Sequence, residues 1–363
     1  MTAKVIDGII KDWGERLNYE RLKPRKGRNI RGGKKTHGND VQKSTAGITP
    51  RKLLKAVRKV PEVMVKISGG GKNMAHIKQH IDYIARNGEL DLEDENGDIH
   101  KGRGELADVR EAWAKGGIGI PEEGERRKEA FNIIFSMPAG TDRNSVKDAV
   151  SAFAADEFAN HQYVFASHED EEHSHVHLCV KAADQYGVRL NPRKPDLQRW
   201  RELFVEKLHD LGIEANATPR WSRGVVQKHE KQTIKQINKG FEEGNRKEPA
   251  RNTQQQINEA ALEVDNSIQH SNPYQEKIIA SRKLAQKLYG SLARELLNGD
   301  KEDKLVALDI AKFVQAMPST NTRHDDLVAN LRDSSTHEVA HKPALSREPI
   351  EIKNEKDRDY GGR

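Results

Sequence analysis

Between positions 162 and 182 the chain has two strand-like segments separated by a short acidic turn, and this pair restricts the fold more than any other feature. The first segment reads QYVFAS and the second SHVHLCVKA, with EDEE between them. Strands joined by so short a connection pair antiparallel, because a parallel pair needs a crossover of a dozen or more residues. The pair therefore predicts a hairpin within an antiparallel sheet.

The segments around this hairpin alternate between strand and helix patterns. Further strands are predicted at 62–68 and 131–137, and helices at 73–87, 106–115, 145–160 and 196–211. This order predicts an α+β fold, in which helices cover one face of a central, mainly antiparallel sheet.

The second segment of the hairpin places two histidines on one face of a strand. Alternate residues of a strand share a face, so His175 and His177 point one way and the apolar residues between and after them point into a core. Their Cα atoms are about 6.5–7 Å apart, which lets both imidazoles reach one metal ion. The hairpin brings His168 back beside them as a third ligand. Three histidines leave coordination positions open for substrate, as in catalytic metal sites.

The alternative is a solvent-facing strand edge that happens to be rich in histidine. Four histidines within ten residues, opposite a cleanly apolar face, favour the metal site. In the acidic turn, Asp170 and Glu172 are candidates to orient an imidazole, or serve only to solvate the turn.

The helix predicted at 73–87 carries a tyrosine away from its apolar stripe. Tyr83 lies about 150° from the centre of the stripe, at 100° per residue, on the side of His76 and His80. The alternatives are an ordinary exposed tyrosine and a phenol nucleophile, since tyrosine can form covalent intermediates.

Three segments together carry a resemblance to a known family. In order along the chain they are GGGKNMAHIKQHIDYIARNGELDL, NIIFSMPAGT and HEDEEHSHVHLCVK. They resemble DNA relaxases of the MOBP type, close in pattern to the border endonuclease that starts T-DNA transfer, over about residues 62–224. His175-Val176-His177 fits the histidine-hydrophobe-histidine nuclease class. A tyrosine ahead of the histidine motif is the relaxase order, whereas rolling-circle replication initiators usually have it after.

The resemblance implies a reaction and a site. The tyrosine attacks a phosphodiester at the nick site of a plasmid transfer origin, stays on the 5′ phosphate and leaves a 3′ hydroxyl; the protein pilots the strand through a type IV secretion system and rejoins its ends. Tyr83 matches the nucleophile and Asp170 the acidic residue of the motif. His168, His175 and His177 match the ligands of a divalent metal, Mg²⁺ or Mn²⁺.

The implied partners are single-stranded or supercoiled plasmid DNA at the transfer origin, relaxosome accessory proteins and a type IV coupling protein. Lys181 stands where several relatives have asparagine, on the face of the two strand histidines, and is predicted to contact the scissile phosphate instead. Further candidates to grip a single strand, with an aromatic ring for base stacking, are Arg189, Arg193, Lys194, Arg220, Trp221 and Arg223. The alternative is surface charge with a tryptophan that anchors the following segment to the core.

Three regions are predicted: a basic extension at 1–60, the relaxase domain at 61–225, and a polar, helical or disordered region at 226–363 that is a candidate secretion or partner segment, with a helical hairpin at 274–317. Residues 20–59 hold 14 Lys and Arg against Glu20 and Asp40, a net charge of +12. Such a block suits a polyanion such as nucleic acid. The alternative is a solvated arm without a partner.

The chain has no apolar run of the roughly 18–20 residues that span a bilayer, which predicts no membrane insertion. Its start is polar, without a signal-peptide pattern, and Cys179 is the single cysteine, which excludes a disulfide framework. A cytoplasmic location is expected. The competing functions are a rolling-circle replication initiator with the same chemistry and a non-enzymatic, basic nucleic-acid-binding protein.

Overall fold

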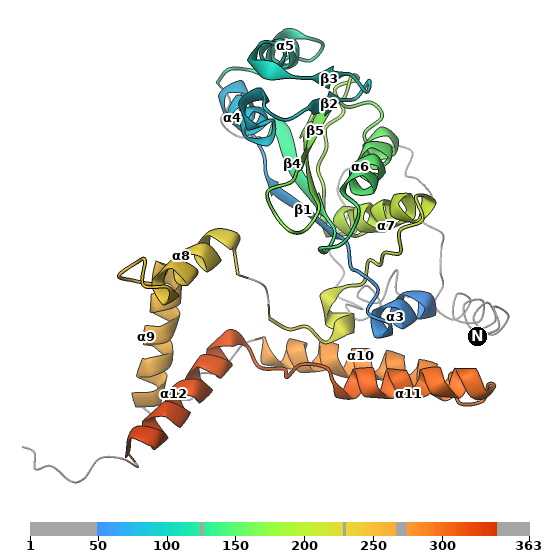
Figure 1. Ribbon diagram of the computed structural model, residues 1–363, viewed down its shortest axis with the longest axis vertical. Helices are drawn as coiled ribbons and strands as arrows, with labels where there is room; N and C mark the ends of the chain where they lie inside the picture. Colours follow the sequence, from blue (N-terminus) through green and yellow to red (C-terminus); the bar gives the residue numbers. More distant parts are fainter. Residues whose placement is uncertain (1–48, 124–126, 228–229, 266–273, 340–363) are drawn as a thin grey trace, which may run out of the picture. The chain divides into compact units, whose positions relative to one another are not determined.

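The structure, a computed structural model, describes residues 49–123, 127–227, 230–265 and 274–339 (Figure 1). These residues divide into two compact units. Unit 1 holds the described residues up to Arg223 together with Lys283–Met317, and unit 2 holds Gly224–Arg282 and the described residues from Pro318 onward. The predicted basic arm lies outside the described residues as far as position 48.

Among the described residues, unit 1 is built on a six-stranded sheet in the order β1-β4-β6-β5-β2-β3. The pairings between these strands are antiparallel, which confirms the predicted α+β class. The predicted hairpin is β5–β6, in which His168 lies opposite His175. The strands are β1 (Met64–Gly69), β2 (Leu92–Asp94), β3 (Ile99–His100), β4 (Ala130–Ser136), β5 (Tyr163–His168) and β6 (His175–Lys181).

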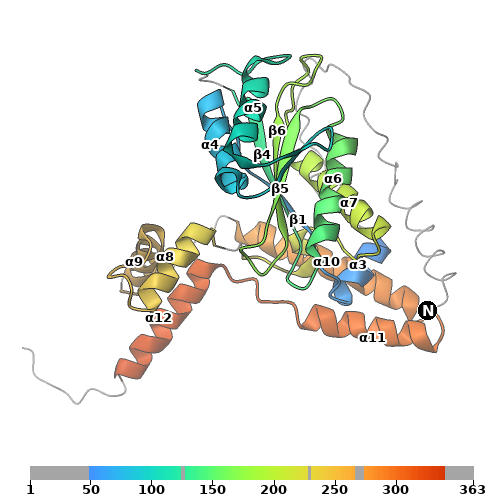
Figure 2. The same ribbon diagram turned by 45° about the horizontal axis from the view of Figure 1, so that its top comes forward.

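Helices cover both faces of this sheet, as Figure 2 shows. On one face lie α4 (Met74–Ile84) and α5 (Gly102–Lys115). On the other lie α6 (Arg143–Glu157) and α7 (Lys194–Asp210).

The prediction that helices cover only one face is therefore wrong. The central strands are apolar on both sides: Val164 and Cys179 pack with α4 and α5, while Phe165 and Leu178 pack with α6 and α7. A sheet with two apolar faces needs a helical layer on each. The face of β6 that carries His175 and His177 is thus covered by a second core rather than exposed to solvent. The polar site lies at the start of the strand, at the edge of that core.

A third group of helices packs within unit 1. Its members are α3 (Pro50–Val57), α11 (Lys301–Gln315) and the part of α10 (Gln275–Leu296) from Lys283 onward. Leu53 and Leu54 of α3 are buried beside Tyr289 and Ile310. The side chain of Thr49 accepts a hydrogen bond from the Lys52 amide and starts α3. The last part of the predicted extension is therefore folded onto unit 1.

Helices α10 and α11 lie where the sequence predicts a helical hairpin. Unit 2 contains α8 (Gln232–Glu242), α9 (Arg251–Asp265) and α12 (Arg323–Val339), with α9 packed against α12. His324 Nε2 of α12 lies 2.8 Å from a carboxylate oxygen of Glu263 on α9. Within the described ranges, none of the helices combines the length and apolar character that crossing a membrane requires.

Candidate functional site

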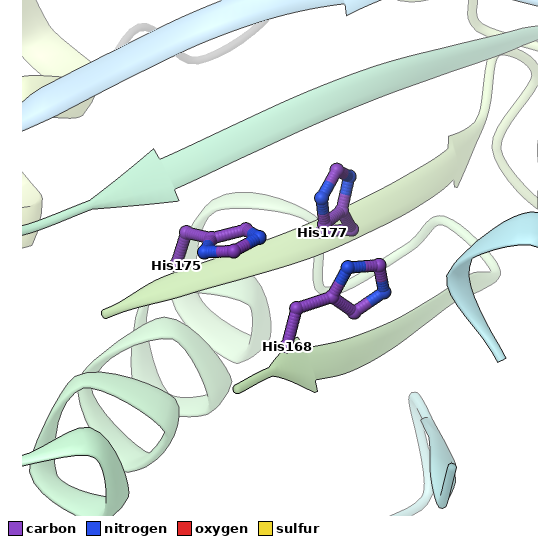
Figure 3. Close-up of side chains that lie close together, drawn as sticks. All are labelled: His168, His175 and His177. Atoms are coloured by element: carbon purple, nitrogen blue, oxygen red, sulfur yellow. The ribbon is translucent and has the colours of Figure 1, made fainter. Parts of the chain in front are cut away.

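Three imidazoles meet where β5 ends and β6 begins. His168 is the last residue of β5, His175 the first of β6, and His177 follows two positions later. One nitrogen from each ring lies within 4.8 Å of the others, and a ring nitrogen of His168 faces His177 (Figure 3). All three residues are buried. The structure thus brings together the predicted histidine trio, as His168, His175 and His177 are called below.

Backbone carbonyls determine which nitrogens of the trio are available. His168 Nε2 lies 2.8 Å from the carbonyl oxygen of Ile84, and His175 Nδ1 lies 3.2 Å from that of His173. A ring nitrogen that donates its proton to a carbonyl leaves the lone pair of the other nitrogen as a ligand. His177 Nδ1 is buried and has no hydrogen-bond partner among the described residues. Converging lone pairs and a buried nitrogen without a partner fit a bound metal ion.

The trio is held uncharged by its surroundings. Burial, assisted by His168, His175, His80 and Arg86, lowers the pKa of His177 to about 3. Burial is also the main cause that lowers the pKa values of His168 and His175. Metal ligands must be deprotonated imidazoles, so this site is ready to bind a cation at neutral pH.

Tyr83 stands beside the trio on α4. The side chain of Asn73 accepts a hydrogen bond from the His76 amide and starts this helix, whose stripe of apolar residues is buried against the sheet. Tyr83 lies off that stripe and is 51% exposed. Its ring centroid is 5.9 Å from that of His168 and 5.7 Å from that of His177. An accessible phenol therefore lies next to the three imidazoles.

Arg86 is a site residue that sequence reasoning missed. Its Cζ atom lies 5.2 Å from the centroid of the Tyr83 ring, and one amino nitrogen lies 3.4 Å from His168 Nδ1. The same nitrogen forms an ion pair with Asp170. Its position three residues after Tyr83, one turn further along the chain, was the available signal.

The acidic turn between β5 and β6 is held by an arginine of α6. Arg143, which follows the N-cap Asp142, donates one hydrogen bond of 3.0 Å to the carbonyl of His168 and another of 2.5 Å to that of Glu171. The turn carries Asp170, whose carboxylate pairs with Arg86 and lies 3.8 Å from His175 Nε2. Asp170 thus lies at the site, as the sequence predicts.

Lys181 lies elsewhere. It is 3% exposed, and its ammonium donates to the side-chain oxygen of Gln162 at 2.8 Å and to the carbonyl of Gly116 at 3.4 Å. It shares the strand face of His177, but four residues separate them by about 13 Å along a strand. The predicted contact with the scissile phosphate does not fit this buried, paired position, because Gln162 and the end of α5 cover the strand there.

The other predicted DNA-binding residues have mixed settings. Arg193 and Lys194 are exposed at the start of α7. Arg189 pairs with the buried Glu129, and Arg223 Nε lies 3.9 Å from a carboxylate oxygen of Glu62. In the short helix Arg220–Arg223, burial and Arg223 lower the pKa of Arg220, and Trp221 packs against the core cluster that α3 shares with α10 and α11. The packing of Trp221 favours the anchoring alternative, and the DNA contacts stay predictions.

Acid is expected to destabilise the folded protein through His177 and His80. The pKa is about 3 for His177 and about 4 for His80, whereas the usual value is 6.5. Between pH 6.5 and these lowered values, the unfolded chain therefore binds protons that the folded chain does not. The free energy of unfolding should therefore fall as the pH drops from about 7 to about 5, by at most about 1.4 kcal/mol per pH unit for each group.

Denaturant titrations at the two pH values measure this fall. A His177→Leu variant has one such group fewer and should show a smaller fall. Equal losses in the variant and the wild type would contradict the assigned burial of His177.

Residues 83–213 match the family model described as "Relaxase: MobA/VirD2-like, nuclease domain". The match begins at Tyr83 and contains the histidine trio. The chain is 27% identical to the T-DNA border endonuclease VirD2 of Rhizobium radiobacter, over 46% of this chain and 44% of that protein. It is 25% identical to the VirD2 proteins of Rhizobium rhizogenes and Agrobacterium fabrum, over 46% of this chain and 43% and 42% of theirs. The matched region spans less than half the length of each relative.

Proposed function

We propose, on the premise that this chain carries a nuclease domain of the MobA/VirD2-like relaxase family, that it is a DNA relaxase that nicks and rejoins one strand at a defined site. The observation that carries the proposal is the placement of Tyr83. Its phenol is half exposed and its ring lies within 6 Å of the rings of His168 and His177, so a nucleophile and a set of metal ligands share one site.

The reaction that fits this site is a transesterification. The Tyr83 oxygen attacks a phosphodiester phosphorus, the new P–O bond forms as the bond to the 3′ oxygen breaks, and the phenol loses a proton while the 3′ oxygen gains one. The products are a 5′-phosphotyrosine and a free 3′ hydroxyl. The reaction conserves the number of phosphoester bonds, so the reverse attack by a 3′ hydroxyl rejoins the strand.

The histidine trio would hold the divalent metal that this chemistry needs. When bound, such an ion polarises the phosphoryl group and offsets its charge during in-line displacement. Backbone carbonyls orient the rings of His168 and His175, so the lone pairs are preset. The ion that we propose for this site is Mg²⁺ or Mn²⁺.

The wider role proposed is plasmid mobilisation, with transfer-origin DNA, relaxosome proteins and a type IV coupling protein as partners. The similarity to T-DNA border endonucleases supports a role in which the chain nicks DNA. A rolling-circle initiator would use the same chemistry, but the position of Tyr83 before the histidine motif favours a relaxase. A non-enzymatic DNA-binding protein would form no covalent product.

The test uses a pool of single-stranded oligonucleotides of random sequence, labelled at the 3′ end in one sample and at the 5′ end in another. The purified full-length protein is incubated with the pool and Mn²⁺, then denatured and separated by electrophoresis. The 3′ label should migrate with the protein and the 5′ label should not, because the protein keeps the 5′ phosphate of the downstream fragment. If neither label stays with the protein, the proposed reaction is wrong.

The basic arm gives a further prediction. Because Leu53 and Leu54 are buried in unit 1, the deletion should remove residues 1–48 and spare α3. Residues 20–48 carry a net charge of +7, so their loss should weaken binding to single strands of any sequence. It should also flatten the salt dependence, by about 0.7 in the log–log slope for each phosphate that the shortened protein no longer binds.

Affinity measured against salt concentration for both proteins checks this prediction. Adduct formation at saturating DNA should survive the deletion, because Tyr83 and the trio lie outside it. An unchanged slope would mean that the arm does not contact DNA.

A further inference from the structure

We propose that Arg86 is a catalytic residue that binds the scissile phosphate, and that Asp170 is the positioning residue that holds Arg86 for this task. The inference rests on the proposed function. Beside the divalent metal ion, it adds a second cationic group, which the chain itself supplies. Neither the family match nor the sequence pattern assigns a role to Arg86.

The position of Arg86 is the first argument. Its guanidinium contacts the Tyr83 ring face, His168 Nδ1 and the Asp170 carboxylate, so it lies between the nucleophile and the metal ligands. Its side chain is 35% exposed, which leaves N–H groups accessible from solvent. A phosphate attacked by Tyr83 and held at the trio would have to lie within reach of this guanidinium.

The lone pair of His168 Nδ1 connects Arg86 with the metal site. His168 Nε2 faces the Ile84 carbonyl and donates its proton there. Nδ1 therefore carries the lone pair, which faces the other two histidines. Arg86 donates to that nitrogen at 3.4 Å. One lone pair serves one strong partner, so in the metal-loaded protein this N–H of Arg86 is no longer needed by His168. It becomes available to a phosphate oxygen, while Asp170 keeps the guanidinium in place.

The backbone around Arg86 is the third argument. Helix α4 ends at Ile84. Arg86 and Asn87 then have left-handed φ angles of 49° and 57°, which residues other than glycine rarely adopt. The turn is fixed because Gly88 packs against the start of α5, where a Cβ atom would lie 2.7 Å from the carbonyl carbon of Gly102. Backbone outliers of this kind cluster at functional sites.

The chemistry of the guanidinium suits the task. Arginine presents a planar fork of donors that matches phosphate oxygens, and it stays charged at working pH. Donors aimed at oxygens that gain charge in the transition state stabilise that state more than the ground state. Asp170, with a carboxylate paired to Arg86, then acts by holding the fork rather than by orienting an imidazole alone.

The test compares Arg86→Ala and Arg86→Lys with Arg103→Ala, a control that removes an equal charge from an exposed position near the same turn. Two quantities are measured: the rate of adduct formation with a cleavable oligonucleotide selected from the random pool, at saturating DNA and Mn²⁺, and the affinity of the DNA-free protein for Mn²⁺. Arg86→Ala should slow the adduct by about 100- to 1000-fold. Arg86→Lys should recover only part of the rate, since it lacks the fork.

The affinity for Mn²⁺ separates this role from a structural one. It should stay equal or rise in Arg86→Ala, because a neighbouring positive charge is removed and the His168 lone pair is no longer shared. A residue that merely supported the ligands would instead lower metal affinity about 10- to 100-fold when replaced. Such a loss, or an adduct rate close to that of the wild type, would overturn the proposal.

Asp170 is tested by a double-mutant comparison. Asp170→Asn should slow the adduct, and the double variant with Arg86→Ala should be no slower than Arg86→Ala alone, because both changes remove the same interaction. If the double variant instead slowed the adduct by the product of the two single effects, Asp170 would not act through Arg86. A wild-type protein that forms no adduct would contradict the proposed function itself, which keeps the two failures distinct.

Discussion

Replacing Tyr83 with phenylalanine is expected to abolish the covalent protein–DNA adduct while DNA affinity stays within a few-fold of wild type. The change removes one oxygen atom from a side chain that is half exposed, so packing and DNA contacts are preserved. Among the described residues, Tyr83 is the hydroxyl-bearing side chain whose ring lies within 6 Å of two of the three histidines. The adduct should fall to the detection limit, because phenylalanine has no nucleophile.

The matched control is Tyr186→Phe, which makes the same change at a tyrosine that is 74% exposed. This variant should form the adduct at the wild-type rate. A full-strength adduct from Tyr83→Phe would remove Tyr83 from the mechanism. Loss of the adduct in Tyr186→Phe as well would show that the effect is not specific to Tyr83. Measuring affinity in the same samples separates a chemical effect from a binding effect.

Replacing either strand histidine, His175 or His177, with alanine is expected to eliminate cleavage and to weaken metal binding by about 10-fold or more. A direct ligand should matter at least as much as the groups that orient ligands, whose removal typically costs 10- to 100-fold in metal affinity. A chelator should stop the wild type for the same reason. His76→Ala is the control, because His76 is exposed on α4 and outside the trio.

Two measurements check this prediction: Mn²⁺ affinity of the DNA-free protein, and adduct formation with the selected oligonucleotide. The His177 change loses no hydrogen bond of Nδ1 among the described residues, but it leaves a cavity where a buried ring stood, so some loss of stability is expected. Cleavage that persists in chelator, or unchanged Mn²⁺ affinity in both histidine variants, would show that the trio is not a metal site.

Much of the fold and of this site could be predicted from local periodicity. Alternation in β6 placed His175 and His177 on one face, and the short acidic turn brought His168 opposite His175, as the register confirms. Helical periodicity placed Tyr83 off the buried stripe of α4. These inferences succeeded because each depends on neighbours in sequence, within one strand, one hairpin or one helix turn.

The features that were missed depend on contacts between distant segments. Lys181 lies on the strand face that carries His175 and His177, but Gln162 and Gly116 bind its ammonium. Alternation along a strand predicts which face a residue is on, and it does not predict what covers that face. Arg86 could be placed near Tyr83 by its position three residues later, but its pairing with Asp170 and His168 joins segments more than 80 residues apart. The folding of α3 onto unit 1 depends on helices far later in the chain, which no pattern within 1–60 could reveal.

Identifying the residue that carries the DNA is the decisive measurement. Trypsin cuts after Lys78 and Arg86, which yields the peptide 79–86 with Tyr83 as its one tyrosine. The adduct formed by the full-length protein is treated with nuclease and trypsin and then analysed by mass spectrometry. We expect this peptide to carry a nucleotide joined through its 5′ phosphate to Tyr83. A nucleotide on any other residue, or a protein free of nucleotide in a sample in which the oligonucleotide was cut, would contradict the assignment of Tyr83 as the nucleophile.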